Sequence, residues 1–290
     1  MSVIAIIGAG PLGGALAHKL AGRNRTAEVR LIDPDESVAR GKALDILQSG
    51  PVENASGRVT AHGSLHAGVG ADAIVFADDV SGTEHSGEAG LALVRQLHAA
   101  GASAPLVFAG ASQRELMQPC IRELHIPAAR VLGTAPTALA SALRALSGAI
   151  LDTSAVEITL QVLGVPPRQT VVAWQEATIS GQPLTAVMGA HEIAALSARI
   201  PGLWPPGPYA LASAAARVAE ALCSGSRRQY SCFVDVGPAL TEPTAGAGRR
   251  GRIVAMPVKL RRGGIERIVA PTLSGQEQTM LENALSIADP

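Results

Sequence analysis

Residues 3–35 constrain the fold of this 290-residue chain more than any other stretch. Val3–Ile7 is a short run of small and β-branched apolar residues, which is typical of a strand buried on both faces of a parallel sheet. Gly8, Gly10 and Gly13 come next with the spacing G-x-G-x-x-G. The first glycine permits a tight turn, the second lets the backbone approach a pyrophosphate, and the third lets the next helix press against the strand. The stretch therefore predicts a strand, a phosphate-binding turn and a helix.

The residues after the turn strengthen this prediction. Residues 14–21 suit a helix whose first amide groups would point at the phosphates, and Glu28–Ile32 suits a second strand. Asp33 ends that strand, where a carboxylate can accept both hydroxyls of an adenosine ribose and repel a 2′-phosphate, so NAD is favoured over NADP. The expected cofactor-binding residues are Gly8, Gly10, Pro11, Leu12, Gly13 and Asp33. The alternative is a domain of the same fold that holds no nucleotide.

Composition excludes several classes of partner. The chain has 24 basic and 24 acidic residues, so no strong field draws it to nucleic acid or to an anionic membrane. Aromatic residues make up 2%, too few for base-stacking platforms. Cys120, Cys223 and Cys232 share no metal-ligand spacing and suit reduced, buried thiols. No signal segment or membrane-spanning apolar run is visible, so we expect a cytoplasmic protein.

Strands and helices alternate through the first half of the chain, which predicts a doubly wound parallel sheet over residues 1–135. After the first two strands, the predicted strands are 58–60, Ala73–Phe76, 105–109 and 129–132. The predicted helices are 36–47, 91–100 and 114–124. The polar, glycine-containing stretch after Phe76 predicts an exposed loop.

The second half, residues 136–290, predicts an α+β domain with antiparallel strands. Its predicted strands are 156–164, 170–179, 231–236, 253–260 and 265–269, with a Pro-Pro turn between the first two. Its predicted helices are 136–148, 191–200, 211–222 and 274–287. In the last of these, Ser274 and Glu277 have the spacing of a capping box.

The stretch 3–35, together with GKALDILQ, ADAIVF, MPVKLRRGGIERIV and the terminal LSGQEQ, resembles the lactate/malate dehydrogenase family nearly from end to end. The resemblance implies a Rossmann doubly wound parallel sheet followed by an α+β domain with antiparallel strands. It also implies NAD as cofactor and a homo-oligomer, dimeric or tetrameric. The family reduces a 2-oxo acid with a histidine oriented by an aspartate, while arginines hold the carboxylate and polarise the carbonyl.

The positions that match the family's catalytic motifs carry other residues. The histidine of the family comes in a G-E-H-G-like turn, which here is Gly164-Val165-Pro166-Pro167. The aspartate and substrate arginine belong to an L-D-x-x-R segment after a Gly-Thr pair, which here leads to Leu139 and Ala142. Arg144 is nearby but lies two residues away, on another helical face. We therefore predict no catalytic residues of the family's type.

The mobile loop also departs from the family pattern. The positions of its two arginines hold Gly82 and Glu88, and a Thr-Ala-Gly segment becomes Ala77-Asp78-Asp79. Each lost cationic contact is worth about 2–4 kcal/mol in a transition state, so the family's reaction should be slowed by many decades. The resemblance with these substitutions indicates a pseudoenzyme-like member.

Asp78 and Asp79 bear on cofactor binding as well, because two negative charges near the diphosphate would weaken NAD binding or abolish it. The alternative is that both side chains turn to solvent. The acids of this loop, together with His85, could hold a hard cation or supply a relocated base, although a solvated charged loop is the simpler interpretation, and no metal site is predicted. Two further alternatives are an NAD-dependent oxidoreductase with an altered substrate and a non-catalytic oligomeric scaffold.

Overall fold

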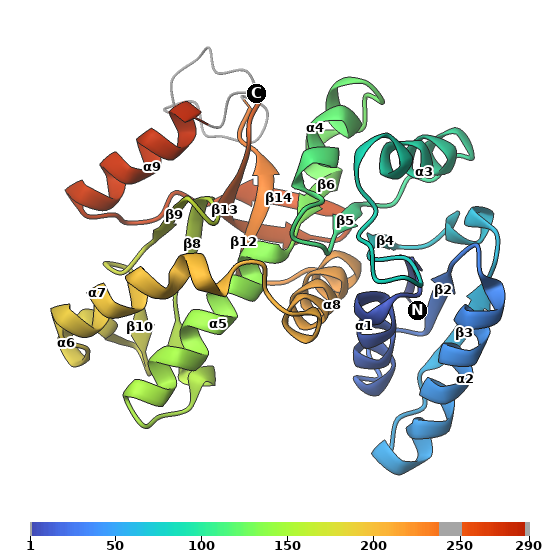
Figure 1. Ribbon diagram of the computed structural model, residues 1–290, viewed down its shortest axis with the longest axis horizontal. Coiled ribbons are helices and arrows are strands. Elements are labelled where there is room, and N and C mark those ends of the chain that lie inside the picture. Colours follow the sequence, from blue (N-terminus) through green and yellow to red (C-terminus); the bar gives the residue numbers. More distant parts are fainter. Residues whose placement is uncertain (1, 238–250, 288–290) are drawn as a thin grey trace.

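A computed structural model describes residues 2–237 and 251–287 of the chain (Figure 1). Its centre is an 11-stranded sheet with the order β3-β2-β1-β4-β5-β6-β12-β13-β8-β9 and with β14 also paired to β13. The parallel strands are β1 (Val3–Ile7), β2 (Glu28–Ile32), β3 (Arg58–His62), β4 (Ala73–Phe76), β5 (Leu106–Phe108) and β6 (Val131–Gly133). The antiparallel strands are β8 (Val162–Val165), β9 (Gln169–Val172), β12 (Gln229–Asp235), β13 (Ile253–Arg261) and β14 (Gly264–Ile268).

Helices cover both faces of the parallel part of the sheet (Figure 1). One face carries, in order of contact, α2 (Glu36–Glu53), α1 (Pro11–Gly22), α8 (Pro208–Ser224) and α5 (Ala135–Ile150). The opposite face carries α3 (Gly87–Ala99) and α4 (Arg114–Arg122). The last helix, α9 (Gly275–Ile287), packs on β8 and β9. Short 3-10 segments are η1 (Leu65–Gly68), η2 (Ala128–Arg130), η3 (Ala155–Glu157) and η4 (Ile200–Leu203).

A small three-stranded sheet completes the second half of the chain. It consists of β11 (Gln182–Pro183), β10 (Thr178–Ile179) and β7 (Ile158–Thr159). The helices α6 (Leu184–Val187) and α7 (Ala190–Arg199) accompany it, α6 against β10 and β11 and α7 against α5 and η4. Within residues 2–237 and 251–287, no helix combines the length and apolar character needed to cross a bilayer.

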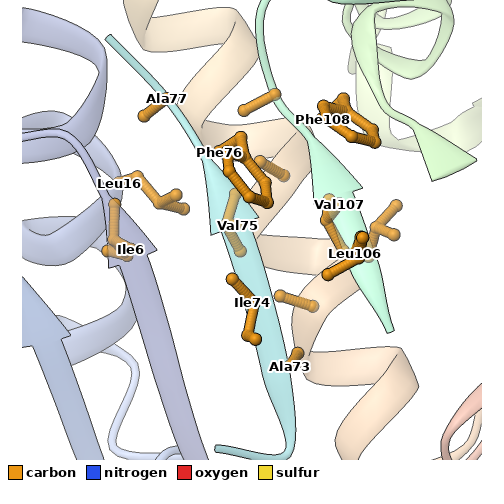
Figure 2. Packing of buried hydrophobic residues seen from close by; sticks show 14 of the residues in the cluster. Ile6, Leu16, Ala73, Ile74, Val75, Phe76, Ala77, Leu106, Val107 and Phe108 are labelled. Carbon is orange, nitrogen blue, oxygen red and sulfur yellow. The ribbon is translucent and has the colours of Figure 1, made fainter. Parts of the chain in front are cut away.

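Buried apolar side chains of β1, β4 and β5, which lie side by side, form part of the main core (Figure 2). Phe76 and Phe108 end neighbouring strands, and their rings stack with centroids 5.2 Å apart. Ile6 on β1 and Leu16 on α1 are fully buried beside them. Strands with both faces covered must be apolar along their whole length, which explains why these runs do not alternate with polar residues. Burial of each large side chain contributes about 1.5–3 kcal/mol.

The predicted fold class is confirmed: a Rossmann-like parallel sheet is followed by antiparallel strands and helices. The two halves share one sheet, because Phe233 of β12 pairs antiparallel with Gly133 of β6. The predicted domain boundary between residues 135 and 136 falls at the start of α5, and the sheet runs across it. The division into two domains stays a prediction.

Two long predicted strands, 156–164 and 170–179, are wrong in detail, because each breaks into two short strands in different sheets. The break beside β8 is held by Ser231, whose hydroxyl donates to Gln161 Oε1 at 2.7 Å and accepts the Val162 amide at 2.9 Å. The apolar pattern continues through the break, so the sequence carries no sign of the change of partner.

Helix ends depend more closely on local chemistry. The predicted capping box at α9 is confirmed: the Ser274 amide donates to Glu277 Oε2 at 2.7 Å, and the Glu277 amide donates to Ser274 Oγ at 3.3 Å. Glu277 Oε1 also accepts the Trp174 amide at 2.9 Å, which fastens α9 to the segment after β9. By contrast, α2 continues past the predicted end at residue 47 and stops at Asn54, which is left-handed with φ 53°.

Candidate functional site

The candidate site lies beyond the carboxyl ends of β1 and β4. These strands are neighbours in the sheet although β2 and β3 separate them in sequence, so the strand order reverses between them. Ile7 is level with Phe76, and Phe76 is level with Phe108. In open sheets of this kind, ligands bind in the crevice outside the strand ends at such a switch point. Both the glycine turn and the stretch from Asp78 to Ser86, here called the 78–86 segment, lie at this point.

The glycine turn has the backbone that its spacing predicts. Gly8 has φ +108°, a left-handed conformation that favours glycine, and its amide donates to Ile32 O at 2.7 Å. A β-carbon at Gly13 would overlap the carbonyl oxygen of Gly8, so glycine there lets α1 pack directly against the end of β1. The helix starts at Pro11 with its N-terminus over the strand end.

Asp33, the residue that follows β2, supports this turn. It is 2% exposed, and its Oδ2 accepts the Ala9 amide at 2.9 Å while its Oδ1 accepts the Asp35 amide at 2.9 Å. The Lys42 ammonium donates to the carbonyl oxygen of the same residue, Ala9 O, at 2.5 Å. The expected ribose-binding carboxylate therefore also fixes the position of the glycine turn.

Asp78 occupies the N-terminus of α1. Its Oδ2 accepts the Leu12 amide at 3.0 Å, its Oδ1 accepts the Gly13 amide at 2.8 Å, and the residue is 4% exposed. The first amides of a helix have no partner within the helix and carry partial positive charge, which makes them an anion site. The expectation of an exposed loop, and the alternative that both acids turn to solvent, are therefore wrong for Asp78.

The backbone of the 78–86 segment fills the space beside this carboxylate. The Gly10 amide donates to Asp78 O at 3.0 Å. A β-carbon at Gly10 would overlap the carbonyl oxygen of Asp79 and the carboxyl group of Asp78. The room that the second glycine of the motif leaves for a pyrophosphate is thus taken by the chain itself. A diphosphate bound at the N-terminus of α1 would therefore compete with Asp78 for the amides of Leu12 and Gly13.

Asp79 faces a different way. Its carboxylate accepts the amide and hydroxyl of Ser81 at 2.9 and 2.5 Å and the Thr83 amide at 3.1 Å. The hydrogen bond from the Ser81 hydroxyl is the main cause that lowers the pKa of Asp79. The Asp79 amide donates to Thr83 O at 2.9 Å, so residues 79–83 form a compact turn closed by their own groups.

Glu84 fastens the other end of the 78–86 segment. Its carboxylate accepts the Ala111 amide at 3.0 Å, the Ser112 amide at 2.8 Å and the Ser112 hydroxyl at 2.5 Å, all in the loop after β5. A β-carbon at Gly110 would overlap this carboxyl group, so glycine makes room for it. Glu84 also forms an isolated antiparallel bridge with Asp78. Sequence reasoning places Glu84 only in an acidic loop and misses these partners.

His85 follows Glu84 near the end of the 78–86 segment. Its Nε2 atom is buried and has no hydrogen-bond partner among the described residues, and it is 3.0 Å from the place that a β-carbon of Gly8 would take. Burial is the main cause that lowers the pKa of His85, and the nearby charges of Asp79, Asp33 and Asp78 act in the opposite direction. The lowered pKa favours the neutral form of this imidazole, whose Nε2 lies close to the glycine turn.

The positions predicted to match the family's catalytic groups lie in the turn between β8 and β9 and in α5. The turn between β8 and β9 contains Pro166, Pro167 and Arg168 and no imidazole. Arg144 donates from Nη2 to the carbonyl oxygens of Ala155 and Val156, at 2.9 and 3.3 Å, and so joins α5 to η3.

Other candidate groups have structural roles. Glu88 pairs with Arg95 at 3.1 Å on the surface of α3. Among residues 2–237 and 251–287, no three His, Cys, Asp or Glu side chains come together as a metal site would require. None of the three cysteines forms a disulfide.

Comparisons with known proteins extend over the whole chain. The malate dehydrogenase of Cereibacter sphaeroides is 30% identical over 309 residues, covering 98% of this chain and 93% of that protein. The crystal structure of malate dehydrogenase from Salinibacter ruber matches with a TM-score of 0.85 at 21% identity, covering 99% of this chain and 95% of that one.

A lactate dehydrogenase from Cryptosporidium parvum, solved with lactic acid and nicotinamide adenine dinucleotide, matches with a TM-score of 0.84 at 18% identity, covering 99% and 96% of the two chains. No family model matches the sequence. The sheet order, the glycine turn and the 30% identity to a malate dehydrogenase over 98% of this chain all point to one family. We conclude that the chain belongs to the lactate/malate dehydrogenase family.

Proposed function

We propose that this chain is a lactate/malate dehydrogenase-like protein that does not catalyse the dehydrogenation of 2-hydroxy acids. The observation that carries the proposal is the turn between β8 and β9, where Pro166 and Pro167 take the place that the family resemblance gives to the acid/base histidine. Hydride transfer to a 2-oxo acid needs a proton donor within hydrogen-bond reach of the carbonyl oxygen, and proline has no exchangeable proton.

The cationic side chains that would bind the substrate carboxylate and polarise its carbonyl are also missing from the positions that the resemblance gives them. Arg144 is committed to two backbone carbonyls of η3, and burial lowers its pKa. Glu88, which stands where the resemblance places a carbonyl-polarising arginine, would repel a carboxylate substrate. At these two positions a substrate carboxylate would therefore find no bidentate cation, and a substrate carbonyl would find no polarising one.

The proposal is tested by steady-state assays with the purified protein. NADH oxidation is measured with oxaloacetate and with pyruvate, and NAD reduction is measured with malate and with lactate. The malate dehydrogenase of Cereibacter sphaeroides serves as a positive control under the same conditions. We expect no turnover above background, whereas a kcat of about 1 s⁻¹ or more with any of these acids lies in the ordinary enzyme range and would refute the proposal.

A second candidate function has one specific observation in its favour. His85 lies in the loop from which a relocated base of an NAD-dependent oxidoreductase is expected, and its buried Nε2 has no hydrogen-bond partner among the described residues. If a panel of alcohols lacking a carboxylate shows NAD reduction, His85→Ala should abolish that activity and His85→Gln should not rescue it. Unchanged activity in His85→Ala would remove this candidate.

The expected homo-oligomer is also retained as a proposal. Leu44 and Leu47 on α2 are 56% and 43% exposed, which is consistent with a face covered by another subunit. Light scattering should give a mass of two or four chains, and a monomer at micromolar concentration would exclude it.

A further inference from the structure

The glycine turn and the N-terminus of α1 are here called the cradle. We propose that the 78–86 segment occupies this cradle: the carboxylates of Asp78 and Glu84 hold the segment where a dinucleotide diphosphate would lie, and so exclude dinucleotides from the wild-type protein. The inference concerns binding and not turnover. It can therefore fail while the proposed function stands, and the reverse also holds.

First, Asp78 and a bound phosphate would compete for the same backbone amides at the N-terminus of α1. A phosphate at this helix N-terminus would need the amides that already donate to Asp78, at 3.0 Å from Leu12 and 2.8 Å from Gly13. The bonds are charge-assisted, and the carboxylate is held within the chain, so it loses little freedom when it binds. A dinucleotide would have to displace this carboxylate from both amides.

The second step is steric. Asp78 O accepts the Gly10 amide, and the Asp79 carbonyl lies where a β-carbon of Gly10 would be. Backbone atoms therefore occupy the close approach that the glycine permits. Entry of a pyrophosphate requires the whole segment to leave, and not only a rotation of the Asp78 side chain.

The third step is the second attachment. Glu84 accepts the amides of Ala111 and Ser112, and Gly110 leaves space for its carboxyl group. Between the two acids, the turn at 79–83 is closed by the bond from the Asp79 amide to Thr83 O. With both ends fastened and the middle compact, loss of one attachment leaves the other in place. Removal of both carboxylates is expected to release the segment.

On the ribose side of the cradle, Asp33 is 2% exposed and accepts the Ala9 and Asp35 amides, and within the described part of the chain no hydrogen bond joins it to the 78–86 segment. Asp33 lies behind the glycine turn, and the carboxylate there is the group that would accept the ribose hydroxyls of an adenine nucleotide. A released segment is therefore expected to uncover a site for a diphosphate-bearing adenine dinucleotide.

The experiment compares NADH and ADP binding to four proteins by fluorescence titration and calorimetry: wild type, Asp78→Ala, Asp78→Ala/Glu84→Ala and Asp79→Ala. Asp79→Ala is the matched control, because it removes the same charge from an adjacent acid whose carboxylate serves its own turn. We expect wild type and control to bind with Kd above about 1 mM and the double variant to bind about tenfold tighter or more, which corresponds to about 1.4 kcal/mol.

Two results would overturn the inference. One is wild-type binding of NADH with a Kd below about 10 μM, which is about 7 kcal/mol of affinity that a closed cradle would not give. The other is a folded double variant that binds no tighter than wild type. If the alanine variants do not fold, the isosteric pair Asp78→Asn/Glu84→Gln replaces them, judged by the same criterion. In addition, hydrogen exchange at Leu12 and Gly13 in the wild type should be unchanged by 1 mM NADH, and slowed exchange would contradict the inference.

Discussion

Replacement of Asp78 should weaken the fold measurably, because the residue caps a buried helix terminus. In Asp78→Ala the amides of Leu12 and Gly13 both lose their acceptor. Hydrogen bonds to charged groups contribute about 1.5–3 kcal/mol each, and removal of a helix N-terminal acceptor costs about 0.5–2 kcal/mol. The two bonds share one carboxylate and are not additive, so we expect a loss of about 2–4 kcal/mol in the free energy of unfolding.

Asp78→Asn should lie between wild type and alanine, because the amide oxygen keeps one acceptor and loses the charge that interacts with the helix N-terminus. The assay is urea denaturation, monitored by the fluorescence of Trp174 and Trp204 and by circular dichroism. Asp79→Ala again serves as the control, and we expect it to cost less than about 1 kcal/mol, as for an exposed turn. A free energy of unfolding for Asp78→Ala within about 0.5 kcal/mol of the wild-type value would refute this expectation. An equal loss of stability in Asp79→Ala and Asp78→Ala would refute it as well.

Three other outcomes are expected. Burial holds the pKa of His85 below its ordinary value of 6.5, so the unfolded chain binds the proton more readily than the folded chain. The free energy of unfolding should therefore fall as the pH drops below about 6.5. His85→Gln should flatten that part of the pH–stability curve, and an unchanged curve would contradict this. Glu277→Ala removes the capping box of α9 and the acceptor of the Trp174 amide, which should cost about 1–3 kcal/mol in urea denaturation, whereas Glu282→Ala on the exposed side of α9 should be nearly neutral. Burial raises the pKa of Cys120 and Cys232 to about 12, so neither should react with a thiol reagent at pH 8 until the protein is unfolded; labelling of the native protein, read by mass spectrometry, would show that the sites open.

The parts of the fold that depend on near neighbours in sequence were predictable. The strand, glycine turn and helix at the start of the chain depend on residues within a few positions of one another, and the capping box of α9 spans only Ser274 to Glu277. The parallel sheet was predictable from the alternation of apolar runs with helical periods. The short strands β7 and β10 were not predicted: the alternation of Ile158, Leu160 and Val162 runs through the first change of sheet partner, and the predicted strand 170–179 overlooks the polar pair Gln175-Glu176 as the break before β10.

The occupant of the candidate site depends on pairs that are distant in sequence. Asp78 meets Leu12 across 66 positions, and Glu84 meets Ala111 across 27. One signal was present: if the two apolar runs are neighbouring parallel strands with Ile7 opposite Phe76, then the acid two residues beyond Phe76 must lie beside the glycine turn. The charge on Asp78 could therefore have been placed in the cradle from topology alone. The length of the turn at 79–83 and the attachment of Glu84 could not.

A helix N-terminus neutralised by its own chain has a consequence for how the protein responds to its surroundings. A protein whose helix N-terminus is neutralised by a bound metabolite gains about 2.7 kcal/mol in its free energy of unfolding when the metabolite is at about one hundred times its dissociation constant. It loses this stability when the metabolite concentration falls. The carboxylate of Asp78 belongs to the chain itself and is therefore present at every concentration of metabolite. The melting behaviour of this protein should accordingly be indifferent to the nucleotide pool around it.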